Sequence, residues 1–488
     1  MKDNKILEEI LNEVDKHPEI MSRRDALKYI TMSPLAAGLI ASATVATSEV
    51  SASSEVKGKI VIAGGGLAGM ATAARLNNLI SNADITVIEP DPLSVSYQPG
   101  QTLVAAGVWS QSDIQYKRDD FLPKGVKLIS KHITSFDPDN NKLTLDNGEE
   151  IAYDQLVVAM GANLNYGAIK GIEGFITSSG ADNAVVKKTI TQNGLHSVYF
   201  ADAASAMWKG MQELIAKAKA HTGPGKLQAV YTMPNTPIKC GGAPLKVMYL
   251  TYSRLQEAGV ADKVELTYYT DGGALFGIPD YNAPIVKQFD ARGFKYNFAH
   301  NLIEVDPVNK VAVFDKWRTE KVYDELIEEE VTKRISERVE VKYDFMHVTP
   351  PMKAPTAVAD SKLGNGNWVN IKQETLQHMD YDNVWVLGDN AGFPMGKTGG
   401  SARKQYKVVA DNLIASANGK PITQKYDGYT VCPLITSLGT VMLAEFNWTK
   451  KPVPSFPLDP TQERWIWWLL KVYALKPMTI YGMLSGKA

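Results

Sequence analysis

The sequence contains little cysteine: only two of its 488 residues are cysteines. Two thiols are too few for a disulfide framework, an iron–sulfur cluster or a cysteine-based zinc site, yet they suffice for one redox pair. Charge of one sign is also lacking, because 52 Lys and Arg stand against 53 Asp and Glu, for a formal net charge of −1. Without a basic field or a basic stripe interleaved with aromatics, we expect no nucleic acid partner, and we expect no bound metal.

A strong membrane-spanning run is missing near the amino terminus, where the apolar stretch 29–46 is interrupted by Ser, Thr and Pro34. This stretch follows the twin-arginine pattern Ser22-Arg23-Arg24-Asp25-Ala26-Leu27-Lys28 and precedes small-residue cleavage candidates at 41–43 and 50–52. Together these features predict a Tat export signal and a periplasm-facing protein. An amphipathic helix or a membrane anchor is the alternative interpretation. Residues 1–20 either precede a true start at Met21 or form a short amphipathic helix, with an apolar face made by Ile6, Leu7, Ile10, Leu11 and Val14.

A dinucleotide-binding fold is predicted from residue 57 onward. The β-branched run 59–63 leads into a turn that fits G-x-G-x-x-G, with glycines at Gly64, Gly66 and Gly69. A helical stretch and a second strand follow, and that strand ends in Glu89. The glycines let the backbone approach a pyrophosphate at a helix N-terminus, and Glu89 is expected to accept hydrogen bonds from the adenosine ribose hydroxyls. An acidic residue at this place favours FAD or NAD over NADP.

Two further motifs distinguish FAD from NAD. Residues 384–390 form an apolar strand that ends in Gly388-Asp389, the pattern with which flavoproteins of two dinucleotide folds present an Asp to the ribityl chain. Residues 151–161 resemble the D-x-L-V-x-A-x-G strand of the same proteins and end in Gly161. Three motifs in the correct order predict an α/β protein with two Rossmann-like domains, similar to glutathione reductase, and bound FAD.

A second G-x-G-x-x-G, which reductases that take electrons from NAD(P)H carry in the middle of the chain, is missing from the sequence. In its place a predicted strand at 227–232 leads to Cys240, and a helical pattern follows over 245–257. Helix N-terminal amides and the neighbouring Lys239 are expected to stabilise a thiolate at Cys240 and to make it a nucleophile.

The second cysteine, Cys432, lies 192 residues beyond the first. In an exported protein a structural disulfide is the default interpretation of such a pair, and two unrelated buried thiols are the next most common outcome. A redox pair is the third. The residues alone leave all three open.

The chain resembles sulfide:quinone oxidoreductases, and among them the branch with two redox cysteines that includes the mitochondrial enzymes. The resemblance runs from about residue 57 to the carboxyl terminus and rests on residues 95–107, 234–246, 347–352, 388–389, 397–398 and 426–434. It implies an enzyme with non-covalently bound FAD that oxidises sulfide to persulfide or polysulfide sulfur. Two electrons would pass through the FAD to a membrane quinone.

The resemblance also implies roles for individual residues. Cys240 and Cys432 match the active-site pair of the family, bridged by a disulfide or by sulfur, and sulfide would attack this bridge and leave a persulfide. Lys397 matches a lysine near the pyrimidine end of the flavin, where a cation stabilises the negative charge of reduced flavin. Gln98 and Thr398 complete the expected cofactor-binding set. Weaker candidates for proton transfer are His347, His378 and Glu445.

The carboxyl terminus is aromatic and apolar with basic residues between. The run 465–475 is too short to span a bilayer and contains Lys471. It fits helices that lie in the membrane interface as a monotopic anchor, from which a quinone reaches the flavin. A C-terminal helix packed on the core is the alternative. Phe446 and Phe393 are candidates for stacking on the quinone ring.

We expect five segments along the chain. They are a signal region 1–55, FAD-binding parts 56–165 and 345–440, a second α/β domain 166–344 that carries Cys240, and a membrane-associating segment 441–488. Within the second domain we expect strands near 197–201, 227–232 and 264–269, and a charge-rich surface helix over 325–338. A homo-oligomer is left open.

Three other functions compete with this interpretation. The flavoprotein subunit of flavocytochrome c sulfide dehydrogenase has a covalently attached flavin, but no cysteine stands near Tyr97 to supply that bond. A type II NADH:quinone dehydrogenase is opposed by the missing second glycine motif. The third alternative is a redox-inactive sulfur carrier or electron-transfer module that keeps FAD for structural reasons.

Overall fold

The computed structural model describes residues 2–22, 24–27, 54–91, 94–172, 174, 184–324 and 329–487. Arg23, the apolar run 29–46 and both cleavage candidates lie outside these residues. The Tat signal therefore stays a prediction.

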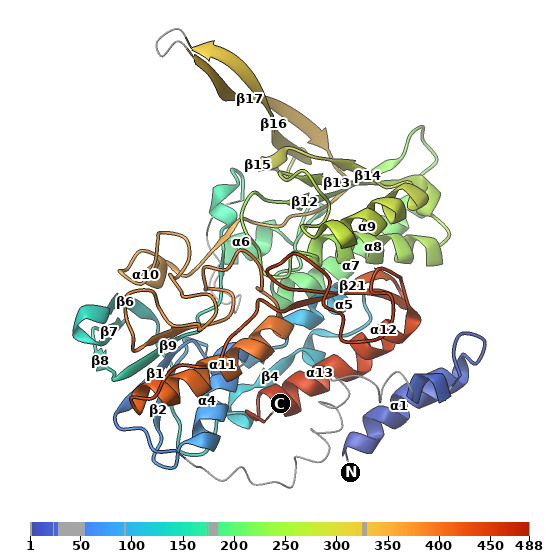
Figure 1. The fold of residues 1–488 in the computed structure, drawn as a ribbon. Helices are drawn as coiled ribbons and strands as arrows, with labels where there is room; N and C mark the ends of the chain where they lie inside the picture. The colour runs from blue at the N-terminus through green and yellow to red at the C-terminus, as the bar shows by residue number, and fades with distance from the viewer. Residues whose placement is uncertain are drawn as a thin grey trace.

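A five-stranded parallel sheet forms the centre of the first domain, with the strand order β20-β9-β1-β2-β5. Its strands are β1 (Lys59–Ala63), β2 (Asp84–Ile88), β5 (Lys127–Ile129), β9 (Gln155–Val158) and β20 (Val384–Val386). Helices α4 (Leu67–Leu79) and α11 (Gly399–Ala417) pack side by side against it (Figure 1). Because helices and loops cover the sheet, its central strands are almost continuously apolar rather than alternating.

A three-stranded antiparallel meander extends this domain, built from β6 (Ile133–Asp137), β7 (Lys142–Leu145) and β8 (Glu150–Ala152). Shorter elements connect the layers. They are β3 (Ser94–Ser96), β4 (Gln115–Lys117), α5 (Gln101–Ala105), β10 (Asn163–Leu164), β19 (Met352–Lys353) and α10 (Thr356–Ala359). Strand β20 joins the first sheet although it comes more than two hundred residues after β9, so this sheet is made from two separate parts of the chain.

A second parallel sheet confirms the second α/β unit, with the order β11-β18-β12-β13-β14. Its strands are β11 (Leu195–His196), β12 (Leu227–Met233), β13 (Val264–Thr270), β14 (Lys295–Asn297) and β18 (Phe345–His347), with helices α6 (Ala184–Thr189), α7 (Ala201–Ala220), α8 (Ala243–Glu257) and α9 (Pro279–Arg292). The strand expected at 197–201 is wrong in position, because residues 195–196 pair with β18 and α7 already begins at Ala201. Strand β18 also extends this sheet past the expected boundary at 344.

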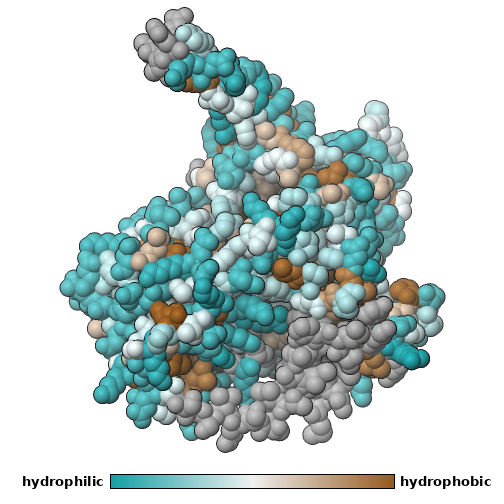
Figure 2. All heavy atoms as spheres, viewed as in Figure 1, coloured by the Kyte–Doolittle hydropathy of each residue, from teal (hydrophilic) through white to brown (hydrophobic). Residues whose placement is uncertain are grey.

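The predicted charge-rich helix over 325–338 is wrong where the structure describes it. Strand β17 (Glu329–Lys342) pairs along its whole length with β16 (Val311–Asp324), and β15 (His300–Asp306) completes the sheet. On β17 the less exposed residues Val331, Ile335 and Val339 are four apart, a spacing that fits one face of a helix and one face of a strand equally well. Residues 329–342 form a strand because their backbone pairs with the long strand β16. The β16–β17 ribbon projects from the body and its surface is mostly hydrophilic (Figures 1 and 2).

The carboxyl terminus folds back over the first domain. After the hairpin of β21 (Thr430–Ser437) and β22 (Thr440–Phe446), the chain forms α12 (Trp465–Leu469), a π-helical turn Leu470–Ala474, α13 (Leu475–Pro477) and a second π-helical turn Met478–Met483. We call residues 465–483 the C-terminal helices. Trp467 and Leu469 are buried, whereas Tyr481 is 57% exposed. The C-terminal helices therefore pack one side on the core of the protein, and residues such as Tyr481 on the other side are exposed.

Residues 2–16 do form an amphipathic helix, α1 (Lys2–Lys16). Ile10, Leu11 and Val14 are buried in one apolar cluster with Trp467 and Leu469 of the C-terminal helices. The ring of His17, just beyond α1, contacts the Trp465 ring at 5.5 Å between centroids. None of the helices in the described part of the chain has the length and apolarity needed to cross a bilayer.

Candidate active site

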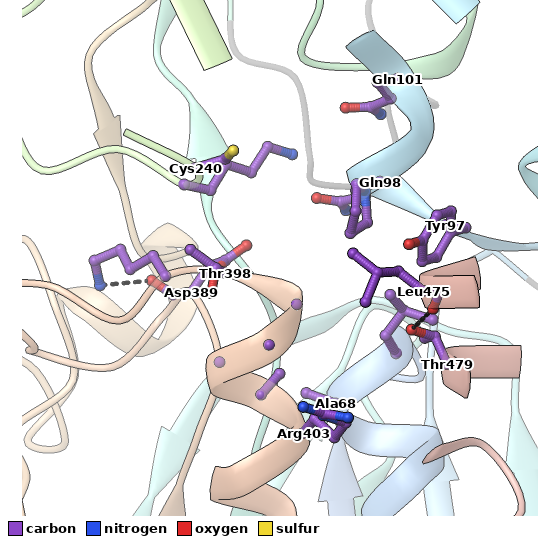
Figure 3. A pocket seen from close by; sticks show the side chains of 18 of the residues that line it. Ala68, Tyr97, Gln98, Gln101, Cys240, Asp389, Thr398, Arg403, Leu475 and Thr479 are labelled. Atoms are coloured by element: carbon purple, nitrogen blue, oxygen red, sulfur yellow. Dashed lines mark hydrogen bonds between the residues drawn. The ribbon is translucent and has the colours of Figure 1, made fainter. Parts of the chain in front are cut away.

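One cavity lies where the carboxyl ends of the strands of the first sheet face the second domain, as expected for an open α/β sheet. Its wall contains Gly66 and Glu89 as well as Cys240, Asp389 and Lys397. The C-terminal helices contribute Leu470, Lys471, Leu475, Met478 and Thr479. Figure 3 shows Cys240 across the cavity from Gln98 and Gln101, with Leu475 and Thr479 beside Tyr97.

The three motif glycines serve different purposes. Gly64 has φ +102°, and a Cβ there would lie 2.4 Å from the carbonyl oxygen of Ala159. A Cβ on Gly69 would lie 1.9 Å from the carbonyl oxygen of Gly64, so this position needs glycine for the approach of α4 to the turn. A Cβ on Gly66 would meet nothing within 4 Å. The cavity therefore reaches the backbone at the N-terminus of α4, where a pyrophosphate fits.

Glu89, directly after β2, also lines the cavity, next to the glycine turn. Its carboxylate accepts hydrogen bonds from the amides of Gly65 (2.8 Å) and Asp91 (3.1 Å). Beside it Arg118 is only 2% exposed and donates to the carbonyls of Asp91 and Gly65. Arg118 was missed by sequence reasoning, because nothing around it distinguishes it from a surface arginine.

The loops after β9 and β20 bring the remaining predicted cofactor residues to the wall. Gly161 donates its amide to the side chain of Asn390 (3.2 Å), and Gly388, at φ +77°, donates to Gln405 (2.9 Å). Thr398 caps α11 by accepting from the amide of Ser401 at 3.2 Å. Asp389 lines the cavity, and burial raises the pKa of its carboxyl group. Gly161, Gly388, Asp389 and Thr398 line one cavity together with Gln98, which follows β3, and their role in binding a cofactor stays a prediction.

Lys397 lines the cavity, but its ammonium already has partners within the protein. It donates to the backbone carbonyls of Asp389 (2.9 Å) and Ala391, and it lies 3.7 Å from the centroid of the Trp368 ring. Burial lowers the pKa of Lys397 to about 7. Its charge therefore holds the loop that carries Asp389, in addition to any effect on a bound cofactor.

The two cysteines, far apart in sequence, meet at this cavity. Cys240 has a left-handed backbone (φ 52°), and its amide donates to the Lys397 carbonyl at 2.8 Å. Cys432, on β21, is buried, and both thiols are free. A hydrogen bond from the Cys432 thiol holds the pKa of Cys240 well below its usual range, whereas the pKa of Cys432 is raised. The structure thus brings together a nucleophilic thiolate and a neutral thiol.

Two lysines that the sequence analysis did not assign surround this pair. Lys246, on the second turn of α8, is 3% exposed and donates to the sulfur of Cys240 at 3.3 Å. Although burial lowers the pKa of Lys246, the negative charge on the sulfurs raises it overall. Lys246 therefore helps to stabilise the thiolate, a role for which we expected Lys239; Lys239 interacts with Cys240 through its charge but donates no hydrogen bond to the sulfur. Lys246 stands among buried residues that run without interruption from Ala243 to Thr251, so no spacing along α8 distinguished it in the sequence.

Lys471 reaches the same place from the C-terminal helices. It is 2% exposed, lines the cavity and donates to the Pro99 carbonyl at 2.8 Å. Burial, and then the charge of Lys246, lower the pKa of Lys471 to about 7. No local signal could have found this residue, because only the fold brings it near the cysteines.

The residues proposed for quinone stacking and proton transfer lie elsewhere. Phe446 packs on Phe276 at 5.9 Å between ring centroids, Phe393 packs on Tyr426 at 5.7 Å, and neither Phe446 nor Phe393 lines the cavity. Both rings pack against aromatic side chains of the protein, so the structure does not support the predicted role in stacking on a quinone. The proton-transfer candidates also lie outside its wall and have structural hydrogen bonds; they are His347, His378 and Glu445.

The class of protein is given by the fold. Residues 58–196 match the family model of the pyridine nucleotide-disulphide oxidoreductases, and the chain has the fold of this class. The chain is 34% identical to the mitochondrial sulfide:quinone oxidoreductase of Dictyostelium discoideum, over 88% of this chain and 86% of that protein. The mitochondrial sulfide:quinone oxidoreductase of Mus musculus is 32% identical, over 87% of this chain and 86% of its own length.

A solved structure agrees in fold. The sulfide:quinone oxidoreductase of Aquifex aeolicus matches with a TM-score of 0.64 at 21% identity, and the match covers 87% of this chain and 92% of that chain. The chain belongs to the sulfide:quinone oxidoreductase family, which confirms the resemblance seen in its motifs.

Proposed function

We propose that this protein oxidises sulfide to sulfane sulfur with the Cys240–Cys432 pair and passes two electrons through FAD to a membrane quinone. One observation carries the proposal: two cysteines from different domains meet on the cavity that also contains the dinucleotide motifs. A structural disulfide would not need a lysine ammonium at 3.3 Å from one sulfur. The buried cation instead favours a thiolate that forms and leaves repeatedly.

The pair is suited to sulfide chemistry when it is oxidised to a disulfide. Hydrosulfide attacks one sulfur, the S–S bond breaks, and the other sulfur leaves as a thiolate; the attacked cysteine becomes a persulfide. Because a thiolate of low pKa leaves faster, we assign Cys240 as the leaving group and Cys432 as the carrier of the persulfide. Lys246 stabilises the released thiolate, and Lys471 adds positive charge that attracts the hydrosulfide anion.

FAD fits the cavity residues. Gly66 leaves open space at the N-terminus of α4 for the pyrophosphate, Glu89 is assigned to the adenosine ribose, and Asp389, which interacts electrostatically with Cys240, is assigned to the ribityl chain. When bound, the flavin supplies a two-electron acceptor next to the cysteines. The two cysteines of the chain meet each other at the site, so we propose that the FAD is held without a covalent bond.

The quinone end of the cavity is proposed at the C-terminal helices. Leu470, Leu475 and Met478 give this part of the wall an apolar surface, and Tyr481 and Trp468 are only partly covered. Aromatic residues with basic neighbours suit the headgroup region of a bilayer. We propose a peripheral membrane protein that faces the periplasm, in which quinone enters past these helices.

The test is anaerobic stopped-flow reduction of the bound flavin by sulfide, followed at about 450 nm, where oxidised flavins absorb. We expect rapid bleaching in the wild type, loss of bleaching in Cys240→Ser and Cys432→Ser, and reoxidation by a soluble quinone. Bleaching by NADH at a comparable rate would instead support the type II dehydrogenase. Flavin that remains on the denatured chain would contradict non-covalent binding and favour the flavocytochrome c alternative.

Export needs its own test. A reporter fused after residue 55 should cross the membrane only when Arg23 and Arg24 are intact. Export of a variant with both arginines replaced by lysine would contradict the twin-arginine route.

A further inference from the structure

Lys239 is the one of four buried lysines around the cavity for which the described residues offer no acceptor. It is 4% exposed and lines the cavity, and its Nζ has no hydrogen-bond partner. The others each have an acceptor: Lys246 has the Cys240 sulfur, Lys397 has two carbonyls, and Lys471 has the Pro99 carbonyl. An unpaired buried ammonium costs several kcal/mol, so a partner is expected at this position.

The charges around Lys239 show which side it faces. Burial lowers its pKa to about 8, while Asp389 and, less strongly, Cys240 raise it. In turn, Lys239 opposes the effect of burial on Asp389 more strongly than Lys397 does. The backbone amide of Lys239 is fixed by a hydrogen bond to the sulfur of Met352 at 3.3 Å. The ammonium thus lines the cavity within electrostatic reach of both Cys240 and Asp389.

We propose that Lys239 completes its hydrogen bonding on the bound flavin cofactor and sets the redox potential of that cofactor by stabilising the negative charge of its reduced form. The inference rests on the proposed FAD site. It assigns to Lys239 the role that the sequence suggested for Lys397, whose ammonium is already saturated by two loop carbonyls and the Trp368 ring. A positive charge close to a flavin ring favours the anionic reduced form.

The experiment is titration of the bound flavin with dithionite against a reference dye of known potential, in wild type, Lys239→Met and Lys239→Arg. Because dithionite replaces sulfide, the result does not depend on the proposed sulfide chemistry. We expect Lys239→Met to shift the ratio of oxidised to reduced flavin at least tenfold toward the oxidised form, which is about 30 mV for a two-electron couple. Lys239→Arg should restore most of the wild-type ratio, because it keeps the charge.

Two controls separate this role from a general loss of charge or of structure. Lys404→Met removes a charge from an exposed position on α11 outside the cavity wall and should leave the ratio unchanged. Lys397→Met should shift the ratio less than Lys239→Met. An unchanged ratio in Lys239→Met, or a larger shift in Lys397→Met, would overturn the proposal.

Loss of FAD from Lys239→Met would still be informative. In that case Asp389 has lost the stronger of its two positive neighbours, and the double variant Lys239→Met/Asp389→Asn should regain FAD in a titration of the apoprotein followed by flavin fluorescence. Failure of the double variant to regain FAD would count against the pairing of these two residues with the cofactor.

Discussion

Replacing Lys246 by methionine removes the ammonium that donates to the Cys240 sulfur at 3.3 Å. A unit charge at this distance is worth about 5 kcal/mol at an effective dielectric constant of about 20. Part of that energy is offset by the cost of burying the lysine, so we take the range for a charged hydrogen bond, about 1.5–3 kcal/mol. Since 1.4 kcal/mol is about a factor of ten, the ratio of thiolate to thiol at Cys240 should fall about tenfold to hundredfold at a given pH.

The assay is alkylation of the reduced protein by iodoacetamide, with modification at each cysteine followed by mass spectrometry as a function of pH. The thiolate is the reactive species, and the pKa of Cys240 is lowered in the wild type, so the wild-type rate persists to low pH. In Lys246→Met the rate profile of Cys240 should move to higher pH. Cys432, whose pKa is already raised in the wild type although Lys246 opposes that rise, should react slowly in both proteins.

Lys471→Met is the matched variant, because Lys471 is also buried and cationic but donates to the Pro99 carbonyl and not to a sulfur. Its effect on Cys240 should be smaller than that of Lys246→Met. Identical profiles for the wild type and Lys246→Met would refute the assignment of Lys246 as the group that stabilises the thiolate.

Three further predictions concern cofactor binding and stability. Gly69→Ala should cost about 1–3 kcal/mol of unfolding free energy and abolish FAD binding, because the new methyl group meets the Gly64 carbonyl; Gly66→Ala should melt normally as apoprotein yet bind FAD more weakly in a titration. Glu445→Gln should lower the unfolding free energy by about 1–3 kcal/mol in urea while leaving flavin reduction unchanged, because Glu445 accepts from Tyr429 and Ser455 outside the cavity; slower reduction would contradict this. Burial lowers the pKa of His347 from 6.5 to about 3, so the unfolded chain binds a proton that the folded chain does not, and stability should fall as pH decreases from about 6.5 toward 3; urea midpoints of His347→Gln should depend less on pH in this range.

The parts of the site that the sequence predicts well are local. Gly64, Gly66 and Gly69 follow a strand and open a helix, and this order of residues is enough to predict the turn. Asp389 follows a strand of the same sheet for a similar reason. The carboxyl ends of neighbouring parallel strands lie at one edge, so motifs more than two hundred residues apart converge without any further information.

What the sequence could not predict depends on long-range packing. Lys471 comes near Cys240 only because the C-terminal helices fold over the first domain, and its basic charge in an aromatic run was equally consistent with a membrane surface. Phe446 was chosen for its residue type, but its neighbours Phe276 and Tyr281 use the ring for packing. Charge alternation on β17 was equally ambiguous until its partner strand was known.

The contact between α1 and the C-terminal helices has a consequence for any processing of the chain. A cut at 41–43 or 50–52 would leave α1 attached to the body without a covalent connection, through contacts such as those of Ile10, Leu11 and Val14. In the uncut chain, α1 covers Trp467 and its neighbours as part of the same molecule, so its effective concentration is high. After the cut, α1 could dissociate from them on dilution. The uncut and the cut protein would thus have the same fold and the same cavity. They would differ in how much apolar surface of the C-terminal helices is free to bind other molecules.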